Sequence, residues 1–176
     1  MQSNNLTYKI RIMKTKSIFG FLFILFFIAS FSAQAQNSAL TGEWKLNREK
    51  TVLADNQLFL SNVTIQVKGD SLLTTRVYEN GNGEQYPFEE NLTLDGKECK
   101  MVIYEMPRTS KASRVASDGS ILIESKTTFS GSNGQEDLLA KETWKVDNES
   151  KMLIIDFTNK MSAGEVTGKS YYNKVK

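Results

Sequence analysis

The stretch Leu40-Thr41-Gly42-Glu43-Trp44-Lys45-Leu46-Asn47 decides the fold expected of this chain. Gly42 permits an unusual φ angle or a close backbone approach at the entrance of a strand. Trp44 supplies a side chain large enough to close the floor of a small barrel. The alternation that follows predicts a first β-strand, with Gly42 and Trp44 as structural residues and later strands closing around them.

The segment that precedes this strand has the pattern of a secretory signal peptide. A basic stretch from Met13 to Lys16 leads into an apolar run of 14 residues, Ile18 to Phe31, and Ala33-Gln34-Ala35 supplies the small-x-small cleavage pattern. A membrane-spanning helix needs about 20 apolar residues. We therefore expect residues 1–35 to be a signal peptide cleaved before Gln36, with residues 1–12 as an upstream extension, and no stable membrane anchor afterwards.

Cleavage there changes the charge of the protein. Four of the 22 Lys and Arg residues, and none of the 20 Asp and Glu residues, lie in residues 1–35, so residues 36–176 carry 18 basic and 20 acidic side chains. The basic character of the full chain therefore belongs to the signal, and nucleic-acid binding loses its main support. The sequence predicts one secreted or periplasmic domain, residues 36–176.

The usual catalytic and metal-binding side chains are scarce. The chain has no His and one Cys, which excludes Ser-His-Asp and Cys-His arrangements, His-containing metal sites and thiolate clusters. No phosphate-binding loop pattern occurs. We expect no cofactor and no metal. Catalysis would have to rest on carboxylates, Tyr, Lys or Arg, and the sequence leaves open whether the protein is an enzyme.

Short alternating segments separated by Gly, Asp and Asn turns follow Trp44 to the end of the chain. This pattern predicts an all-β fold, an up-and-down antiparallel barrel of about 8–10 strands, with a sandwich as the alternative. Asp95-Gly96 predicts a type I′ hairpin. The strands expected after the first are 62–68, 72–79, 86–94, 97–105, 109–116, 120–129, 136–146, 151–159 and 165–175.

Three features do not fit a simple meander. The segment Arg48–Ser61 is too long for a hairpin and predicts a lid-like loop over the barrel mouth, or a loop that merely covers the floor. Met106-Pro107 is expected to interrupt the sheet. Arg108, Lys111 and Arg114 are interpreted as a solvated basic face, in preference to a site for an anionic partner.

Alternation also places polar side chains on apolar faces. Arg76 and Tyr78 share a face with Leu72, and an Arg-x-Tyr pair inside a barrel could bind a ligand carboxylate. The alternatives are a buried ion pair between Arg76 and Glu142, or acid–base catalysis by an inward carboxylate. The residues expected to contact a ligand are Arg76, Tyr78, Phe88, Glu90, Ile121, Ile123, Phe129 and Glu142.

The ordered motifs resemble bacterial secreted lipocalin-like domains over residues 38–176. The motifs are Gly42-x-Trp44-Lys45-Leu46-Asn47 with Lys50, Leu94-Asp95-Gly96-Lys97, Glu142-x-Trp144 and Ser150-Lys151-x-Leu153-x-Ile155. The resemblance implies a lipocalin-like or fatty-acid-binding-protein-like barrel, and Arg76 and Tyr78 look like the carboxylate-binding pair of the latter. The last strand departs from the pattern, because it offers Lys169 and Lys174 where lipocalins place an Arg over the Trp.

Together these features predict an exported protein that binds a small hydrophobic or amphipathic molecule. Two alternatives remain: an envelope interaction module with a filled core, and a His-free isomerase or lyase based on carboxylates and Tyr.

Overall fold

The computed structural model describes residues 39–53, 58–131 and 134–175. The expected signal peptide, residues 1–35, lies outside this part, as do residues 54–57 of the expected lid-like loop. The described residues form ten β-strands: β1 Gly42–Leu46, β2 Phe59–Lys68, β3 Ser71–Glu79, β4 Gln85–Thr93, β5 Cys99–Ile103, β6 Met106–Arg114, β7 Ile121–Gly131, β8 Gly134–Val146, β9 Leu153–Met161 and β10 Gly164–Lys174.

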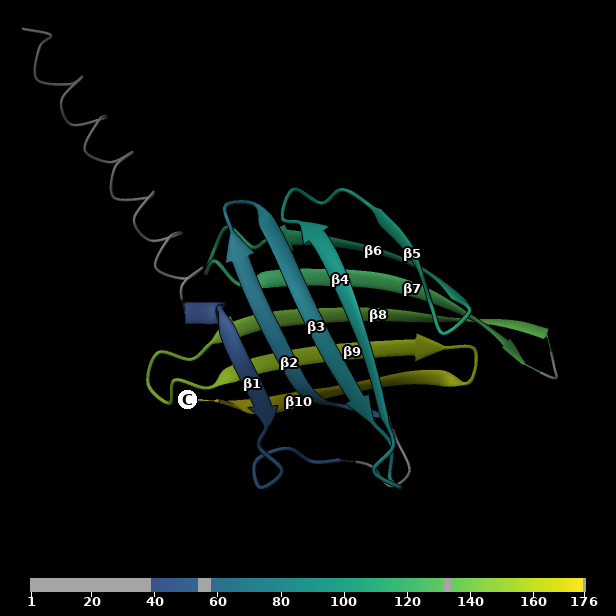
Figure 1. Cartoon of the computed structure of the whole chain (residues 1–176), viewed down its shortest axis with the longest axis horizontal. Helices are drawn as coiled ribbons and strands as arrows, with labels where there is room; N and C mark the ends of the chain where they lie inside the picture. Colours follow the sequence, from purple (N-terminus) through teal and green to yellow (C-terminus); the bar gives the residue numbers. More distant parts are fainter. Residues whose placement is uncertain (1–38, 54–57, 132–133, 176) are drawn as a thin grey trace, which may run out of the picture. The chain divides into compact units, whose positions relative to one another are not determined.

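The strands form one antiparallel sheet in the order β4-β3-β2-β1-β10-β9-β8-β7-β6-β5. The first strand pairs with both β2 and the last strand, so that Trp44 lies between Val63 and Lys174. In Figure 1, β1–β4 cross in front of β6–β10. The sheet is a nearly closed up-and-down β-barrel, which confirms the predicted fold class. Closure at β1 removes the exposed edge that a terminal strand would otherwise present.

The seam of the barrel lies between β4 and β5, not at the chain termini. Asp95 forms an isolated bridge with Ser113 of β6, and Gly96 N donates to Ala112 O at 2.8 Å. The prediction of a hairpin at Asp95-Gly96 is therefore wrong, because this turn bonds to β6, and the strand that follows it, β5, pairs with β6 and not with β4. The contact between this turn and β6 depends on the tertiary structure, because the curvature of the whole sheet brings β6 to the turn.

Two strand limits also differ from the prediction. β2 begins at Phe59, inside the segment expected to be a loop, and a register shift between Leu60 and Asn62 marks a bulge. Pro107 lies within β6, so the expected interruption at Met106-Pro107 is wrong. The turn is instead made by Tyr104 and Glu105, both with positive φ (48° and 67°), as a type I′ hairpin requires. The pairing between β6 and β7 begins at Arg108, one residue after Pro107. The N–H group that Pro107 lacks therefore removes no hydrogen bond between these two strands.

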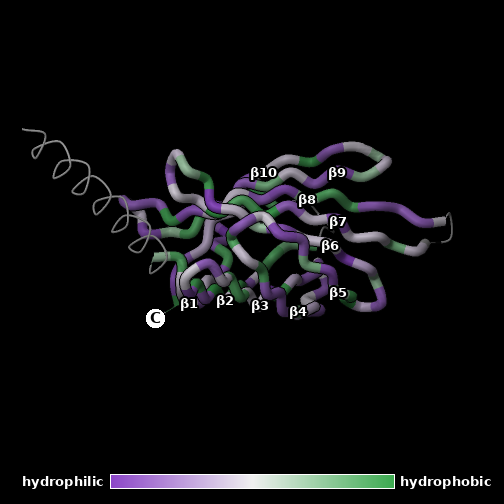
Figure 2. The backbone as a smooth tube through the Cα atoms, turned by 90° about the horizontal axis from the view of Figure 1, so that it is seen from above, coloured by the Kyte–Doolittle hydropathy of each residue, from purple (hydrophilic) through white to green (hydrophobic). Residues whose placement is uncertain are grey.

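Apolar side chains fill one end of the barrel. Figure 2 shows β1–β4 along one wall and β7–β10 along the opposite wall, with hydrophobic and hydrophilic residues alternating along the strands. Trp44, Trp144 and Tyr172 are the largest apolar side chains among those that are less than 2% exposed. The packed cluster also contains Leu40, Leu46, Leu60, Val63, Ile65, Leu72, Leu92, Leu94, Ala112, Ile121, Ile123, Leu153 and Ile155.

Trp44 is held from two sides. Its indole Nε1 donates to Leu40 O at 2.8 Å, and the ammonium of Lys174 lies 5.1 Å from its ring centroid. Gly42 allows this contact, because a Cβ there would lie 2.6 Å from Lys174 Cε and its φ is +142°. The last strand therefore supplies a cation over this tryptophan, and that cation is the lysine Lys174.

Candidate functional site

Four charged side chains meet inside the barrel. Arg76 comes from β3, Glu90 from β4, Arg108 from β6 and Glu142 from β8. Each alternates with apolar or small residues that face the interior, so the pleat of its strand turns it inward. Arg76 and Glu90 are 0% and 1% exposed, respectively. We call these four residues the ionic network.

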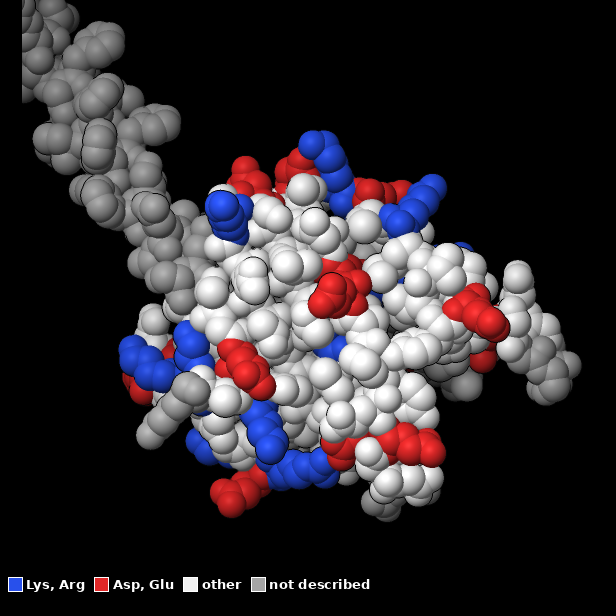
Figure 3. All heavy atoms as spheres, in the orientation of Figure 1, with Lys and Arg blue, Asp and Glu red and all other residues white. Residues whose placement is uncertain are grey.

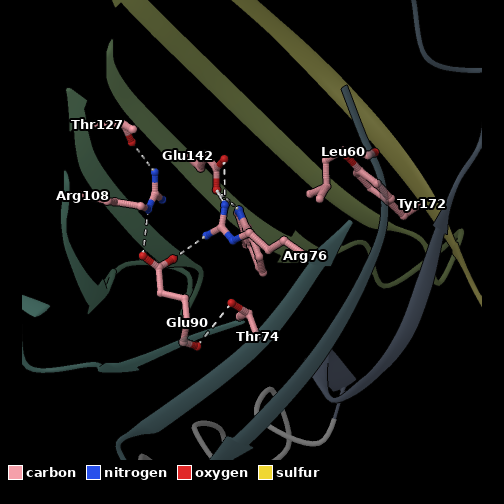
Figure 4. A network of polar contacts seen from close by, with 9 residues as sticks. Leu60, Thr74, Arg76, Glu90, Arg108, Thr127, Glu142 and Tyr172 are labelled. Atoms are coloured by element: carbon pink, nitrogen blue, oxygen red, sulfur yellow. Dashed lines mark hydrogen bonds and ion pairs between the residues drawn. The ribbon is translucent and has the colours of Figure 1, made fainter. Parts of the chain in front are cut away.

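The ionic network is continuous across the barrel (Figure 4). Arg76 Nη1 lies 3.1 Å from Glu142 Oε1 and 2.9 Å from Oε2. Arg76 Nη2 lies 3.5 Å from Glu90 Oε2, and Arg108 Nε donates to Glu90 Oε1 at 3.0 Å. The inward orientation of Arg76, Glu90 and Glu142 agrees with the pattern of the sequence. The predicted ion pair between Arg76 and Glu142 is present.

Neighbouring side chains fix the orientation of this network. Trp144 Nε1 donates to Glu142 Oε2 at 2.9 Å, and Arg108 Nη1 donates to Thr127 Oγ1 at 3.0 Å. The Arg76 guanidinium also lies 4.8 Å from the Trp144 ring. Such contacts to charged groups are stronger in a buried setting than in water. The charged side chains are therefore held by several elements at once.

Burial and ion pairing shift the pKa values of Arg76 and Glu90 in opposite directions. Burial alone raises the pKa of Glu90, but the charges of Arg76 and Arg108 outweigh it and hold the Glu90 pKa below its usual value. Burial lowers the pKa of Arg76, but Glu142, Tyr78 and Glu90 raise it above its usual value. Burial, followed by the charge of Glu142, raises the pKa of Tyr78. Arg76 and Glu90 are thus ionised at neutral pH, and Tyr78 is a neutral phenol.

A ring of partly exposed apolar side chains borders the network on the inner face. Phe88 pairs in register with Arg76, and Phe157 pairs with Glu142. The other two members are Met101, the partner of Arg108, and Leu138, the partner of Thr127. All four are partly exposed, unlike the fully buried apolar cluster at the other end. We call Phe88, Met101, Leu138 and Phe157 the apolar rim.

The other residues expected to contact a ligand fall into two groups: some lie beside the apolar rim, and others lie in the packed apolar cluster. Tyr78 stacks on Phe88, with ring centroids 6.0 Å apart, and therefore belongs beside the apolar rim. Phe129 lies two residues beyond Thr127 on the same face of β7 and is partly exposed. Ile121 and Ile123 are 0% and 1% exposed and belong to the packed apolar cluster. They line no open part of the inner face.

Arg108 is the member of the network that sequence reasoning missed. It was expected on a solvated basic face with Lys111, but its guanidinium is buried between Glu90 and Thr127, whereas Lys111 is exposed and pairs with Glu124 at 3.0 Å. The signal was present in the sequence, because Arg108, Ser110 and Ala112 alternate as one inward face. The strand begins before Pro107, at Met106, so Arg108 lies inside β6 and shares this inward face.

Two hollows lie on the outside of the barrel. One, of about 600 Å³, is flanked by outward side chains of β5–β10, among them Lys100, Lys141 and Lys160. The other, of about 450 Å³, lies near Arg48 and Glu79. Figure 3 shows acidic and basic groups interspersed on the face that carries β1–β4, without a patch of one sign.

Within residues 39–53, 58–131 and 134–175, no group of His, Cys, Asp and Glu side chains has an arrangement that could hold a metal ion. The same residues contain no helix long and apolar enough to cross a membrane. The chain matches no family model, no curated protein and no solved structure.

Proposed function

We propose that this protein is an exported, lipocalin-like barrel that binds a small amphipathic molecule on its inner face. The observation that carries the proposal is the contact between the apolar rim and the ionic network. Three rim residues lie in register with charged members of the network, and the fourth, Leu138, lies in register with Thr127, which accepts from Arg108. Ligand sites in proteins are mainly apolar, with a few convergent polar groups.

The apolar rim would desolvate the hydrophobic part of the ligand. Complete burial of a large apolar side chain or equivalent ligand surface contributes roughly 1.5–3 kcal/mol. The ionic network would orient the polar end. Acid–base catalysis is the less favoured use of the same residues, because the two arginines lower the pKa of Glu90 and make it a weak base.

Leu138 and Leu139 provide a matched pair for the test. They are adjacent on β8, and Leu138 faces the interior while Leu139 points outward and is 46% exposed. The protein is expressed from its full-length sequence, recovered from the envelope and the medium, and examined by native mass spectrometry followed by solvent extraction. We expect an amphipathic molecule to co-purify, to be lost in Leu138→Asn, and to be retained in Leu139→Asn. Equal retention in both variants would contradict binding at the apolar rim.

The second candidate function is an envelope interaction module with no ligand. It is favoured by the filled apolar end of the barrel and by the lysine-flanked hollow on the outside. An empty protein in the same measurement, together with failure of the purified protein to bind any added amphiphile, would select this function over ligand binding.

A further inference from the structure

The strand register aligns three lysines on the outer face of the barrel. Lys100 of β5 pairs with Thr109 of β6, and Thr109 pairs with Lys126 of β7. Lys126 pairs in turn with Leu139 of β8, and Leu139 pairs with Lys160 of β9. One cross-strand row therefore carries a lysine on every second strand, with a threonine and a leucine between them. We call Lys100, Lys126 and Lys160 the lysine row.

The lysine row lies along the hollow of about 600 Å³ on the outer face. All three lysines are exposed, and Leu139 between them is 46% exposed. Lys126 forms an exposed ion pair with Asp137 at 2.7 Å, whereas Lys100 and Lys160 pair with no acidic group in the part of the chain that the structure describes. Because exposed ion pairs are weak, Lys126 can exchange Asp137 for another anion. The whole row is therefore accessible to a partner.

The hollow is positive, although residues 36–176 as a whole are not. Five lysines and three glutamates line it, whereas residues 36–176 carry 18 basic and 20 acidic side chains. Glu124 is already engaged by Lys111 at 3.0 Å. The other two glutamates lie at opposite ends of the hollow, Glu98 before β5 and Glu165 on β10. The middle of the hollow thus presents cations, and charge complementarity favours an anionic partner.

The spacing of the lysine row matches that of an extended peptide. Neighbouring strands lie about 4.7–4.9 Å apart, so lysines on every second strand recur at about 9.4–9.8 Å. A polyproline II helix has three residues per turn and rises about 3.1 Å per residue, so each of its sides recurs at about 9.3 Å. Its backbone is solvated and needs no hydrogen-bond partner, which suits the face of a sheet, where only side chains are offered.

Two other anionic partners fit the hollow less well. Single-stranded nucleic acid binds in basic grooves that also carry aromatic side chains for base stacking, and none of the described residues that line this hollow is aromatic. A second copy of this chain would need an acidic patch to meet the lysines. Acidic and basic groups are instead interspersed on the face that carries β1–β4 (Figure 3).

We propose that the lysine row docks an acidic segment of a partner protein, in a polyproline II conformation with Asp or Glu at every third residue. Each carboxylate contacts one lysine, and the residues between the carboxylates pack over Thr109 and Leu139. This inference is independent of ligand binding at the apolar rim. It gives the second candidate function a partner of stated chemistry.

Two twelve-residue peptides of the same composition provide the test. One repeats Glu-Pro-Pro, and the other repeats Glu-Glu-Pro-Pro-Pro-Pro, so they differ only in the spacing of the carboxylates. Each peptide carries fluorescein at its N-terminus, and its binding to the purified protein is measured by fluorescence anisotropy. At about 20 mM salt we expect the Glu-Pro-Pro repeat to bind at least about threefold more tightly, and to weaken at about 150 mM salt as screening increases. Equal affinities of the two peptides would contradict the proposal.

Substitutions in the lysine row test its position. Lys126→Gln and Lys160→Gln should each weaken binding of the Glu-Pro-Pro repeat by about two- to fivefold, the effect of one exposed ion pair. Lys68→Gln is the matched control, because Lys68 is an exposed lysine at the end of β2, on the opposite wall, and it should leave the affinity unchanged. An equal effect of all three substitutions would reveal non-specific attraction and overturn the proposed site.

A heparin fragment distinguishes the class of partner. Tighter binding of heparin than of the Glu-Pro-Pro repeat would assign the lysine row to an acidic glycan and overturn the peptide. If neither the peptides nor heparin bind at low salt, the row is a solvated face and the inference fails. Co-purification of an amphipathic molecule that depends on Leu138 would still support the proposed function in that case.

Discussion

Replacing the two partners of the Arg76–Glu142 pair, separately and together, tests whether the ionic network is held by charge balance. Arg76→Met leaves Glu142 without a cation, while Glu90 keeps Arg108 at 3.0 Å. Glu142→Gln leaves Arg76 with Glu90 as its remaining anionic partner, at 3.5 Å. The amide oxygen of the new Gln can still accept from Trp144 Nε1, so this variant removes charge without removing the acceptor.

The expected magnitudes follow from the number of stranded charges. Breaking a buried ion pair by removing one partner costs about 3–5 kcal/mol, and we expect Arg76→Met to lie in this range. In the double variant the remaining pair, Arg108 with Glu90, is again neutral. The double variant should therefore be less destabilised than the sum of the single variants by at least about 2 kcal/mol.

The free energy of unfolding is measured by urea denaturation, with far-UV circular dichroism as the signal and an unchanged slope as the check for two-state behaviour. The control cycle uses Lys111→Met and Glu124→Gln, a cross-strand pair at 3.0 Å whose side chains are 48% and 41% exposed. Its coupling should be about 0–1 kcal/mol. Additivity within about 0.5 kcal/mol at the Arg76–Glu142 pair would refute the reasoning.

Three further predictions concern other parts of the barrel. The pKa of Glu90 is lowered in the folded state, so ionised Glu90 stabilises the fold above its usual pKa of 4.5. This stabilisation is lost as the pH falls through the pKa that Glu90 has in the folded protein. Glu90→Gln should therefore lose less Tm than the wild type between about pH 5 and pH 2. Gly168→Ala should destabilise by about 1–3 kcal/mol, since its Cβ would lie 2.5 Å from Phe157 Cζ, and Phe157→Leu in the same chain should restore part of the loss in a thermal melt. Lys174→Ala should cost about 0.5–1 kcal/mol by removing the cation over Trp44, whereas Lys174→Arg should retain the stability measured in urea.

Which side chains enter the barrel was largely predictable, because side-chain direction in a strand is a local property with a period of two residues. Alternation placed Arg76, Glu90 and Glu142 on the interior, and the structure finds them there. The same rule would have placed Arg108 there too. Alternation did not predict the inward direction of Arg108, because a proline such as Pro107 usually marks the end of a strand. The actual turn lies at Tyr104-Glu105, two residues that rarely adopt positive φ.

The sequence by itself determined the all-β class, a barrel of about 8–10 strands and most of the inward faces, since turn chemistry and alternation act between near neighbours in the chain. Only the tertiary structure decided how those faces meet. It placed the seam between β4 and β5, brought Lys174 onto Trp44, and joined four charges from four strands into one network. These contacts depend on the curvature and register of the closed sheet, which sum over every strand and appear in no single segment.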